Sequence, residues 1–202
     1  MSAWLSRNAR DNHGPAIGSL FLRVLCGLSV SSVFLLFAFT PEAVARPSAA
    51  QVEAAFTPGD DIAGMIRERI ARAKASVRVQ AYLLTDRTIA AALLAACRRG
   101  LEVEVIGDAA QFESGGLPWL AALDRAGARV YLNTSHAASH NKIVILDGGL
   151  PGAAVITGSY NFTQAAQSKN AENIVIIPRS SAVTDLFVDN FAEQRSQSRP
   201  WP

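Results

Sequence analysis

The chain has 202 residues, half of them hydrophobic, and a formal net charge of +2. This length suits one ordinary domain and is too short for two comfortable ones, and the apolar share is sufficient for a self-supporting core. The nearly balanced charge gives no sign of a strongly basic molecule, so any nucleic-acid footprint has to be local.

The first 45 residues have the order of a secretory signal peptide. Three arginines precede a 16-residue apolar run, Val24 to Phe39, and the small-residue triplet Ala43-Val44-Ala45 follows. The run is shorter than the roughly 20 residues of a comfortable membrane span, which favours cleavage over anchoring. We therefore expect a signal peptide at residues 1–45, a mature domain at residues 46–202 and a periplasmic or secreted protein. The alternative is a retained N-terminal segment, which would be the chain's contact with a membrane.

Strand-like and helix-like patterns alternate along the rest of the chain. The glutamates of one predicted strand, Glu102 and Glu104, alternate with apolar residues, which predicts a half-exposed strand near a sheet edge. Seven predicted strands and five predicted helices indicate an α/β domain with one mixed, mostly central β-sheet flanked by helices on both faces. In chain order, strands are expected at 52–56, 76–84, 101–106, 128–132, 143–146, 153–156 and 173–177, and helices at 60–74, 88–98, 118–126, 161–168 and 182–194.

The stretch from Ser139 to Asp147, SHNKIVILD, places two polar side chains at the beginning of a buried strand. Side chains alternate along a strand, so His140 and Lys142 point to the same face. Such groups are costly beside an apolar run unless they have partners or a chemical role. Asp147 lies seven residues after His140, roughly 23 Å along a straight strand. A structural role is therefore expected for it, such as pinning the following turn.

A second stretch, Thr157 to Thr163, predicts a strand end that runs into a helix. Gly158 allows another group to approach the backbone closely. Ser159 and Asn161 supply a hydroxyl and an amide beside the expected helix N-terminus, where anions are favoured. Together with the histidine and the lysine, these groups suit a phosphate, because positioning and charge neutralisation supply most of the catalysis in phosphoryl transfer.

Three motifs together resemble the phospholipase D superfamily, and most of all its small members with a single H-x-K motif, such as the exported bacterial endonucleases. The interval between the first two motifs is longer than in the family pattern, and the extra residues fall in a Gly/Pro turn. The motifs are His140-x-Lys142-x4-Asp147, then Gly158-Ser159-x-Asn161-Phe162-Thr163, then Asn170-Ala171-Glu172-Asn173.

The resemblance implies a two-step phosphodiester hydrolysis without metal or cofactor. His140 would attack phosphorus and form a phosphohistidine. Lys142 and Asn161 would hold the nonbridging oxygens, and Ser159 would support that pocket. Glu172 would accept a hydrogen bond from the far ring nitrogen of His140 and so fix its tautomer.

This chemistry requires a second histidine, as general acid and then base. The chain has three histidines, and His13 lies in the expected signal peptide. Because there is one H-x-K motif, we expect a homodimer in which two copies of His140 share one site. His136 and His140 are four apart, a spacing used by helical zinc ligands, but the following apolar run reads as a strand, which argues against a metal site.

Three functions are compatible with this pattern. A nonspecific exported endonuclease acting on DNA, and on RNA as well, would use backbone contacts and need few base-reading features. A phospholipid phosphodiesterase would use the same chemistry and should have an apolar collar around the site, whereas the loop Ser135 to Ser139 is small and polar. A noncatalytic binding protein could retain the fold, although its site residues would then have no reason to be intact.

Overall fold

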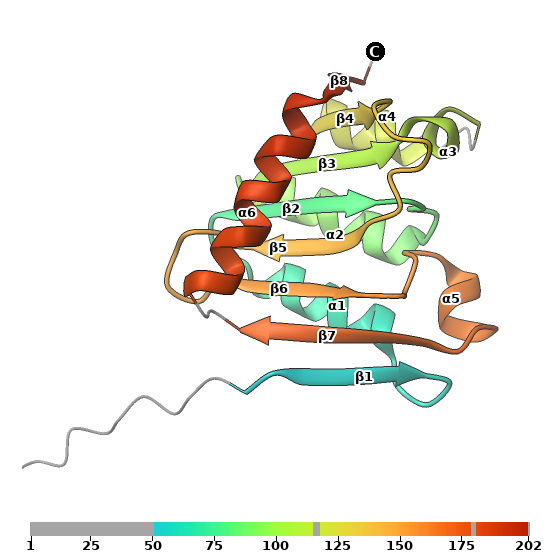
Figure 1. The fold of residues 1–202 in the computed structure, drawn as a ribbon, viewed down its shortest axis with the longest axis vertical. Coiled ribbons are helices and arrows are strands. Elements are labelled where there is room, and N and C mark those ends of the chain that lie inside the picture. Colours follow the sequence, from blue (N-terminus) through green and yellow to red (C-terminus); the bar gives the residue numbers. More distant parts are fainter. Residues whose placement is uncertain (1–50, 115–117, 179–180, 202) are drawn as a thin grey trace, which may run out of the picture. The chain divides into compact units, whose positions relative to one another are not determined.

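The computed structural model describes residues 51–114, 118–178 and 181–201 and contains a single eight-stranded sheet (Figure 1). The expected signal peptide at residues 1–45 lies outside the described residues. The strand order is β1-β7-β6-β5-β2-β3-β4-β8; β2, β3 and β4 run parallel, and the other neighbours pair antiparallel. The strands are β1 Glu53–Thr57, β2 Ser76–Ala81, β3 Glu102–Asp108, β4 Arg129–Asn133, β5 Lys142–Leu146, β6 Ala154–Gly158, β7 Glu172–Pro178 and β8 Ser198–Pro200.

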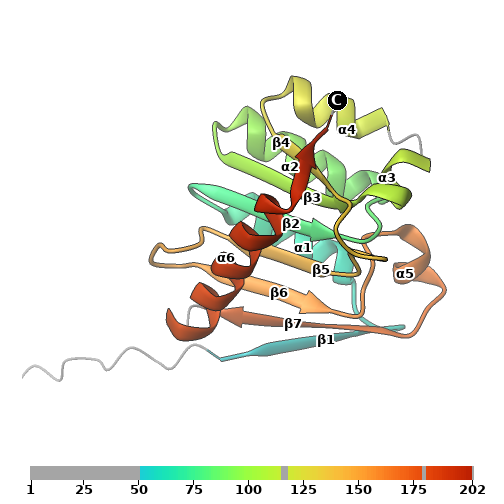
Figure 2. The same cartoon turned by 45° about the horizontal axis from the view of Figure 1, so that its top comes forward.

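Helices cover both faces of the sheet, which confirms the predicted α/β class. Helix α6 crosses one face, and α1 and α2 lie behind the other (Figures 1 and 2). No helix in the described ranges is both long and apolar enough to cross a membrane. The helices are α1 Ile62–Arg72, α2 Arg87–Arg98, α3 Ala109–Ser114, α4 Pro118–Arg125, α5 Gln164–Ser168 and α6 Ser181–Ser196.

Strand β5 lies in the middle of the sheet and is buried along its whole length. Its side chains alternate between two apolar clusters. Val144 and Leu146 join the larger cluster with α1 and α2, whereas Ile143 and Ile145 join a smaller one beneath Phe191 of α6. Burial on both faces explains why this segment is a continuous apolar run rather than an alternating one.

The sheet has one strand more than the seven expected. The additional strand, β8, pairs antiparallel with β4 through the contacts Tyr131 to Pro200 and Asn133 to Ser198. It is three residues long and polar, so it carries no periodic signal, and its partner is more than 60 residues away in the sequence. The short helix α3 was also not expected.

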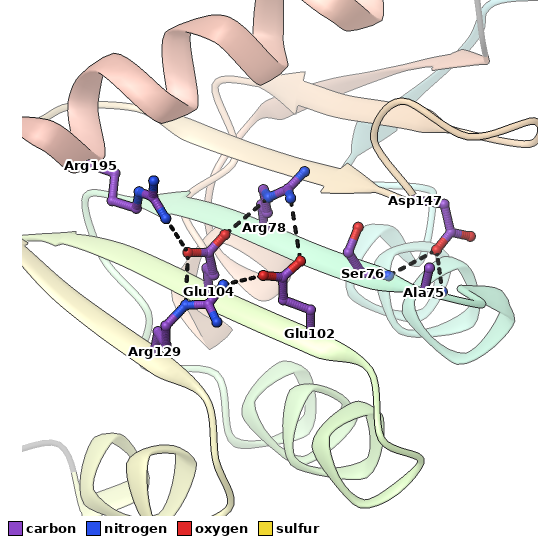
Figure 3. Close-up of polar contacts among 8 residues, drawn as sticks. All are labelled: Ala75, Ser76, Arg78, Glu102, Glu104, Arg129, Asp147 and Arg195. Atoms are coloured by element: carbon purple, nitrogen blue, oxygen red, sulfur yellow. Dashed lines mark hydrogen bonds and ion pairs between the residues drawn. The ribbon is translucent and has the colours of Figure 1, made fainter.

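The prediction that Glu102 and Glu104 mark a half-exposed strand near an edge was wrong. Strand β3 lies inside the sheet, between β2 and β4, and Glu104 is 2% exposed. Its carboxylate is paired with the guanidinium groups of Arg78 at 3.1 Å, Arg129 at 3.1 Å and Arg195 at 3.2 Å (Figure 3). The alternation therefore reflects a charge cluster beneath α6 rather than a solvated face.

Two elements near the candidate site are shorter than expected. Strand β2 ends at Ala81, and the next backbone N–H, of Tyr82, still donates to the carbonyl of Asn141 at 2.8 Å. Helix α5 begins at Gln164 and not near Asn161, since Thr163 is its N-cap and accepts a hydrogen bond from the backbone of Ala166.

Candidate active site

The candidate residues converge because four strands end or begin at one edge of the sheet. The register places Lys142 of β5 beside Ala81 of β2, and the next residue, Ile143, beside Thr157 of β6. Gly158 at the end of β6 lies beside Ile174 near the start of β7. The side chains of His140 and Lys142, the turn after β6 and Glu172 therefore meet at this edge, although up to 32 residues separate them in the sequence.

His140 and Lys142 contact each other directly. The Lys142 ammonium lies 2.9 Å from Nδ1 and 3.3 Å from Nε2 of the imidazole, and it donates to the His140 carbonyl at 2.8 Å. The ring of Tyr82 lies 4.4 Å from the imidazole, centroid to centroid, and 5.1 Å from the ammonium. His140 is exposed, whereas Lys142 is 7% exposed. The histidine is therefore accessible to a substrate, and the lysine is fixed beneath it.

Burial lowers the pKa of Lys142 below its ordinary value, and the negative charge of Glu172 partly offsets this effect. An ammonium group has three donors and no acceptor. A ring nitrogen that accepts from it carries a lone pair, and the tautomer decides which of the two nitrogens this is. Such an unprotonated nitrogen is what a nucleophile or a general base requires.

Gly158 and Ser159 lie where the end of β6 packs closely against the start of β7. A Cβ on Gly158 would lie 2.2 Å from the carbonyl oxygen of Asn173, so the strands can approach this closely because this residue is a glycine. The Ser159 hydroxyl accepts a hydrogen bond from the backbone of Asn173 at 3.0 Å and donates to Glu172 at 2.6 Å. Within the single chain, this hydroxyl therefore holds the two strands and the glutamate together.

The Glu172 carboxylate accepts hydrogen bonds from Ser159 and from the side-chain amide of Asn170, at 2.6 and 2.8 Å. The hydrogen bond that was expected with the imidazole of His140 is not among the contacts of these two described residues. The negative charge of Glu172 nevertheless raises the pKa of Lys142 and so partly offsets the effect of burial. The orienting role of Glu172 towards the histidine stays a prediction, and in this state its partners are its β6 and β7 neighbours.

Asn161 does not cap a helix, and neither does Ser159, because α5 begins later at its Thr163 cap. The expected anion-binding helix N-terminus at these two residues is therefore absent from this part of the structure. The side-chain oxygen of Asn161 is buried and, within the described residues, has no hydrogen-bond partner. Such an amide is costly to leave unsatisfied. As an acceptor, this oxygen can be satisfied only by a hydrogen-bond donor, so a phosphate would have to be held by Nδ2 of the same amide.

The side chain of Asp147 contacts the turn before β2, whereas its backbone carbonyl accepts a hydrogen bond from Leu150 in the following turn, where a structural role was expected. Its buried carboxylate accepts hydrogen bonds from the backbone N–H groups of Lys74, Ala75 and Ser76 at 2.7 to 3.1 Å. Figure 3 shows those from Ala75 and Ser76. The longer interval of the motif forms the β5–β6 hairpin after Asp147. This hairpin lies at the opposite end of β5 from the histidine, so the extra residues leave the site edge unchanged.

A buried carboxylate that the sequence analysis missed anchors the residue before the histidine. Asp108, at the end of β3, is 5% exposed and accepts a hydrogen bond from the backbone N–H of Ser139 at 2.8 Å. It also accepts from the backbone of Gln111 at 3.0 Å. An acidic residue at the end of an apolar strand was the available signal, but its partner lies 31 residues away.

His136 lies exposed in the loop between β4 and β5, not on a helix. The helical spacing of zinc ligands therefore does not apply to His136 and His140. Within the ranges 51–114, 118–178 and 181–201, no group of three His, Cys, Asp or Glu side chains could hold a metal ion.

Comparisons with known proteins agree with this geometry. The family described as "Cardiolipin synthase, PLD-like domain" matches residues 66–195. A phospholipase D of Rickettsia bellii is 31% identical over 155 residues, which cover 77% of this chain and 74% of that protein. A mitochondrial cardiolipin hydrolase of Danio rerio is 27% identical over 176 residues, 86% of this chain and 70% of that protein.

Two solved structures have the same fold. Nuc from Salmonella typhimurium, a phospholipase D family member, has a TM-score of 0.67 and 29% identity, with 75% of this chain and 97% of that chain covered. NucT from Helicobacter pylori has a TM-score of 0.68 over 75% of this chain and 99% of that chain; at 19% identity it is evidence for the fold alone. The family match, the relatives and the shared sheet lead to one conclusion: the chain belongs to the phospholipase D superfamily of phosphodiesterases.

Proposed function

We propose that this protein is a metal-independent, nonspecific endonuclease, exported under the direction of residues 1–45, that hydrolyses nucleic-acid phosphodiester bonds through a phosphohistidine. The observation that supports this most directly is the pairing of an exposed imidazole with a buried ammonium at 2.9 Å, at the sheet edge that also carries the Asn161 amide. A nucleophile, a fixed cation and a hydrogen-bonding amide are what a bound phosphodiester needs.

The rim of the site favours a nucleic acid over a lipid. The loop from Thr134 to Ala138 is exposed and consists of small or polar side chains. Arg87 at the start of α2 and Lys169 after α5 are exposed at the same edge, and neither has an ion-pair partner in the described part of the chain. Such cations can contact successive phosphates of a polymer without reading its bases.

In the first step, a ring nitrogen of His140 attacks phosphorus, a nitrogen–phosphorus bond forms, and the bond to the leaving oxygen breaks. The phosphate oxygens draw the Lys142 ammonium away from the imidazole and so release the attacking lone pair, while Nδ2 of Asn161 donates a further hydrogen bond to a phosphate oxygen. The leaving oxygen takes a proton from a second histidine. In the second step, water attacks phosphorus, gives a proton back to that histidine, and the nitrogen–phosphorus bond breaks.

The second histidine is His140 of the partner subunit in a two-fold dimer. Exposed apolar side chains on the α6 face of the sheet support this assembly: Leu186 of α6 is 68% exposed and Phe56 of β1 is 58% exposed. A pocket between α6 and the start of β5 is lined by Ile143, Leu186 and Phe187, next to the H-x-K motif. Packing two such faces together would bury apolar surface next to the sheet edge that carries the H-x-K motif.

Leu186→Arg should convert the dimer into a monomer and lower specific activity at least about tenfold, because a charge would be buried in an apolar contact. Leu150→Arg is a matched control, since Leu150 is 44% exposed but lies in the hairpin at the far end of β5. It should remain a dimer with normal activity. Sedimentation at the assay concentration measures the mass. A monomeric wild-type protein with full activity would contradict the shared site.

A phospholipid phosphodiesterase is the second candidate, because the relatives include proteins named phospholipase D and mitochondrial cardiolipin hydrolase. Wild type and His140→Ala should be compared on plasmid DNA and on phospholipid vesicles, both in EDTA. We expect DNA cleavage by wild type alone and no headgroup release. Headgroup release without DNA cleavage would replace the endonuclease proposal by the lipid one, and loss of all activity in EDTA would overturn the metal-free mechanism.

A further inference from the structure

A chain of three side-chain amides connects α6 with the H-x-K motif. Gln80 of β2 is the middle member and is 1% exposed. Its Oε1 accepts a hydrogen bond from Nδ2 of Asn141 at 2.7 Å, and its Nε2 donates to Oδ1 of Asn190 on α6 at 3.2 Å. These three residues are far apart in the sequence and come from separate elements of the sheet and its covering helix.

Asn141 occupies the position between the two residues placed in the catalytic machinery. It precedes β5, so it lies just outside the regular ladder, and its carbonyl accepts the backbone N–H of Tyr82 at 2.8 Å. Its side chain points to the α6 face, where it lines a pocket with Asn190, whereas His140 and Lys142 point to the other face. Holding Asn141 by its carbonyl and by its side chain fixes the backbone from which both neighbours project.

We propose that Gln80 is a positioning residue that sets the attack geometry of His140 and Lys142 through Asn141. An amide with no hydrogen bonds is costly to bury, and an apolar side chain of similar size would otherwise suit this site beneath α6. Asn190 holds the Gln80 amide in the orientation that presents its oxygen to Asn141. The inference rests on the proposed function, in which these two residues act on phosphorus.

Positioning by Gln80 affects turnover more than binding. A displacement of the nucleophile by about 1 Å can lower the rate roughly 100-fold. Gln80→Met keeps the length of the side chain and removes both hydrogen bonds. We expect kcat to fall about 10- to 100-fold, with KM within about threefold of wild type, because Gln80 itself touches no substrate group.

Gln80→Glu is the conservative rescue. Its carboxylate can still accept from Asn141, and the Asn190 amide can turn so that its nitrogen donates. We expect kcat to lie closer to wild type than to Gln80→Met. Hydrolysis of bis(4-nitrophenyl) phosphate is a suitable readout, because it requires neither a nucleic acid nor a lipid, and sedimentation should show that each variant keeps the wild-type mass.

A double-mutant cycle covers the case in which Gln80→Met does not fold or loses its mass. Asn190→Ala, at an exposed position on α6, should lower kcat a few fold in the wild type. It should have no further effect in the Gln80→Met background. If Gln80→Met is not folded, Asn141→Ala serves as the second background, with the same expected result. Asp189→Ala, its exposed neighbour, should leave kcat unchanged.

The proposal is overturned if folded Gln80→Met keeps kcat within about twofold of wild type, or if Asn190→Ala acts equally in both backgrounds. These failures differ from failure of the proposed function. In that case His140→Ala would hydrolyse the same substrate as fast as wild type, and no effect of Gln80 could be expected.

Discussion

Replacing His140 with alanine should lower kcat by at least about 10⁴-fold, because removing the nucleophile of a covalent mechanism leaves the binding groups and little else. Lys142, Asn161 and the β6 turn remain in place, since the imidazole is exposed and supports no buried contact beyond Tyr82 and Lys142. Substrate binding should therefore persist while turnover is lost. Single-turnover rates with the enzyme in excess over substrate measure this step directly.

His136→Ala is the matched control, because it is the other histidine within the described ranges and lies exposed in the preceding loop. It should keep kcat within about threefold of wild type. If His140→Ala were to retain more than a tenth of the wild-type rate, the phosphohistidine route would have to be abandoned. If both variants lost activity to a similar extent, His136 of the same chain would be the general acid and base in place of the partner's His140.

Glu104→Gln should lower the free energy of unfolding by about 3 kcal/mol, the scale on which a buried charge pair is lost when one partner is removed. Glu104 is 2% exposed and pairs with Arg78, Arg129 and Arg195. The substitution is isosteric but leaves the three guanidinium groups facing one another with less compensation (Figure 3). Urea unfolding at neutral pH measures the difference.

Glu102→Gln is the control for position and partners. Glu102 lies on the same strand and contacts the same two arginines, Arg78 and Arg129, but its side chain is 43% exposed. Solvent screening should reduce its effect to less than about 1 kcal/mol. Equal destabilisation by the two substitutions would show that burial does not decide the strength of this cluster.

The Glu104 effect should depend on pH. Burial by itself raises the pKa of Glu104, but hydrogen bonds from Arg129 and Arg78 and the charges of Arg129 and Arg195 outweigh it, so the pKa is lowered. Its stabilising contribution is therefore fully present above the ordinary glutamate pKa of about 4.3 and is lost as pH falls through the lower folded value. The stability difference between wild type and Glu104→Gln should be constant near neutrality and shrink in acid.

The local features of the site could be predicted from short stretches of sequence. The apolar run after Lys142 predicted a buried strand, and the two-residue period placed His140 and Lys142 on one face, as found in their 2.9 Å contact. The helix expected at 88–98 is found as α2, and Asp86 caps it by accepting from the backbone of Thr88 and Ile89. These features depend on neighbours within a few residues, so their signals are contained in a short window of sequence.

The distant partners of the buried polar residues could not be predicted and are set by the folded arrangement of the sheet. Glu104 looked like a solvated position and is instead neutralised by arginines from β2, β4 and α6. Gln80 bridges the H-x-K motif to α6, and Asp108 anchors the residue before His140. The character of a buried polar side chain depends on groups brought to it by the packing of the sheet. No pattern along the chain encodes them, because they are 25 to 110 residues away.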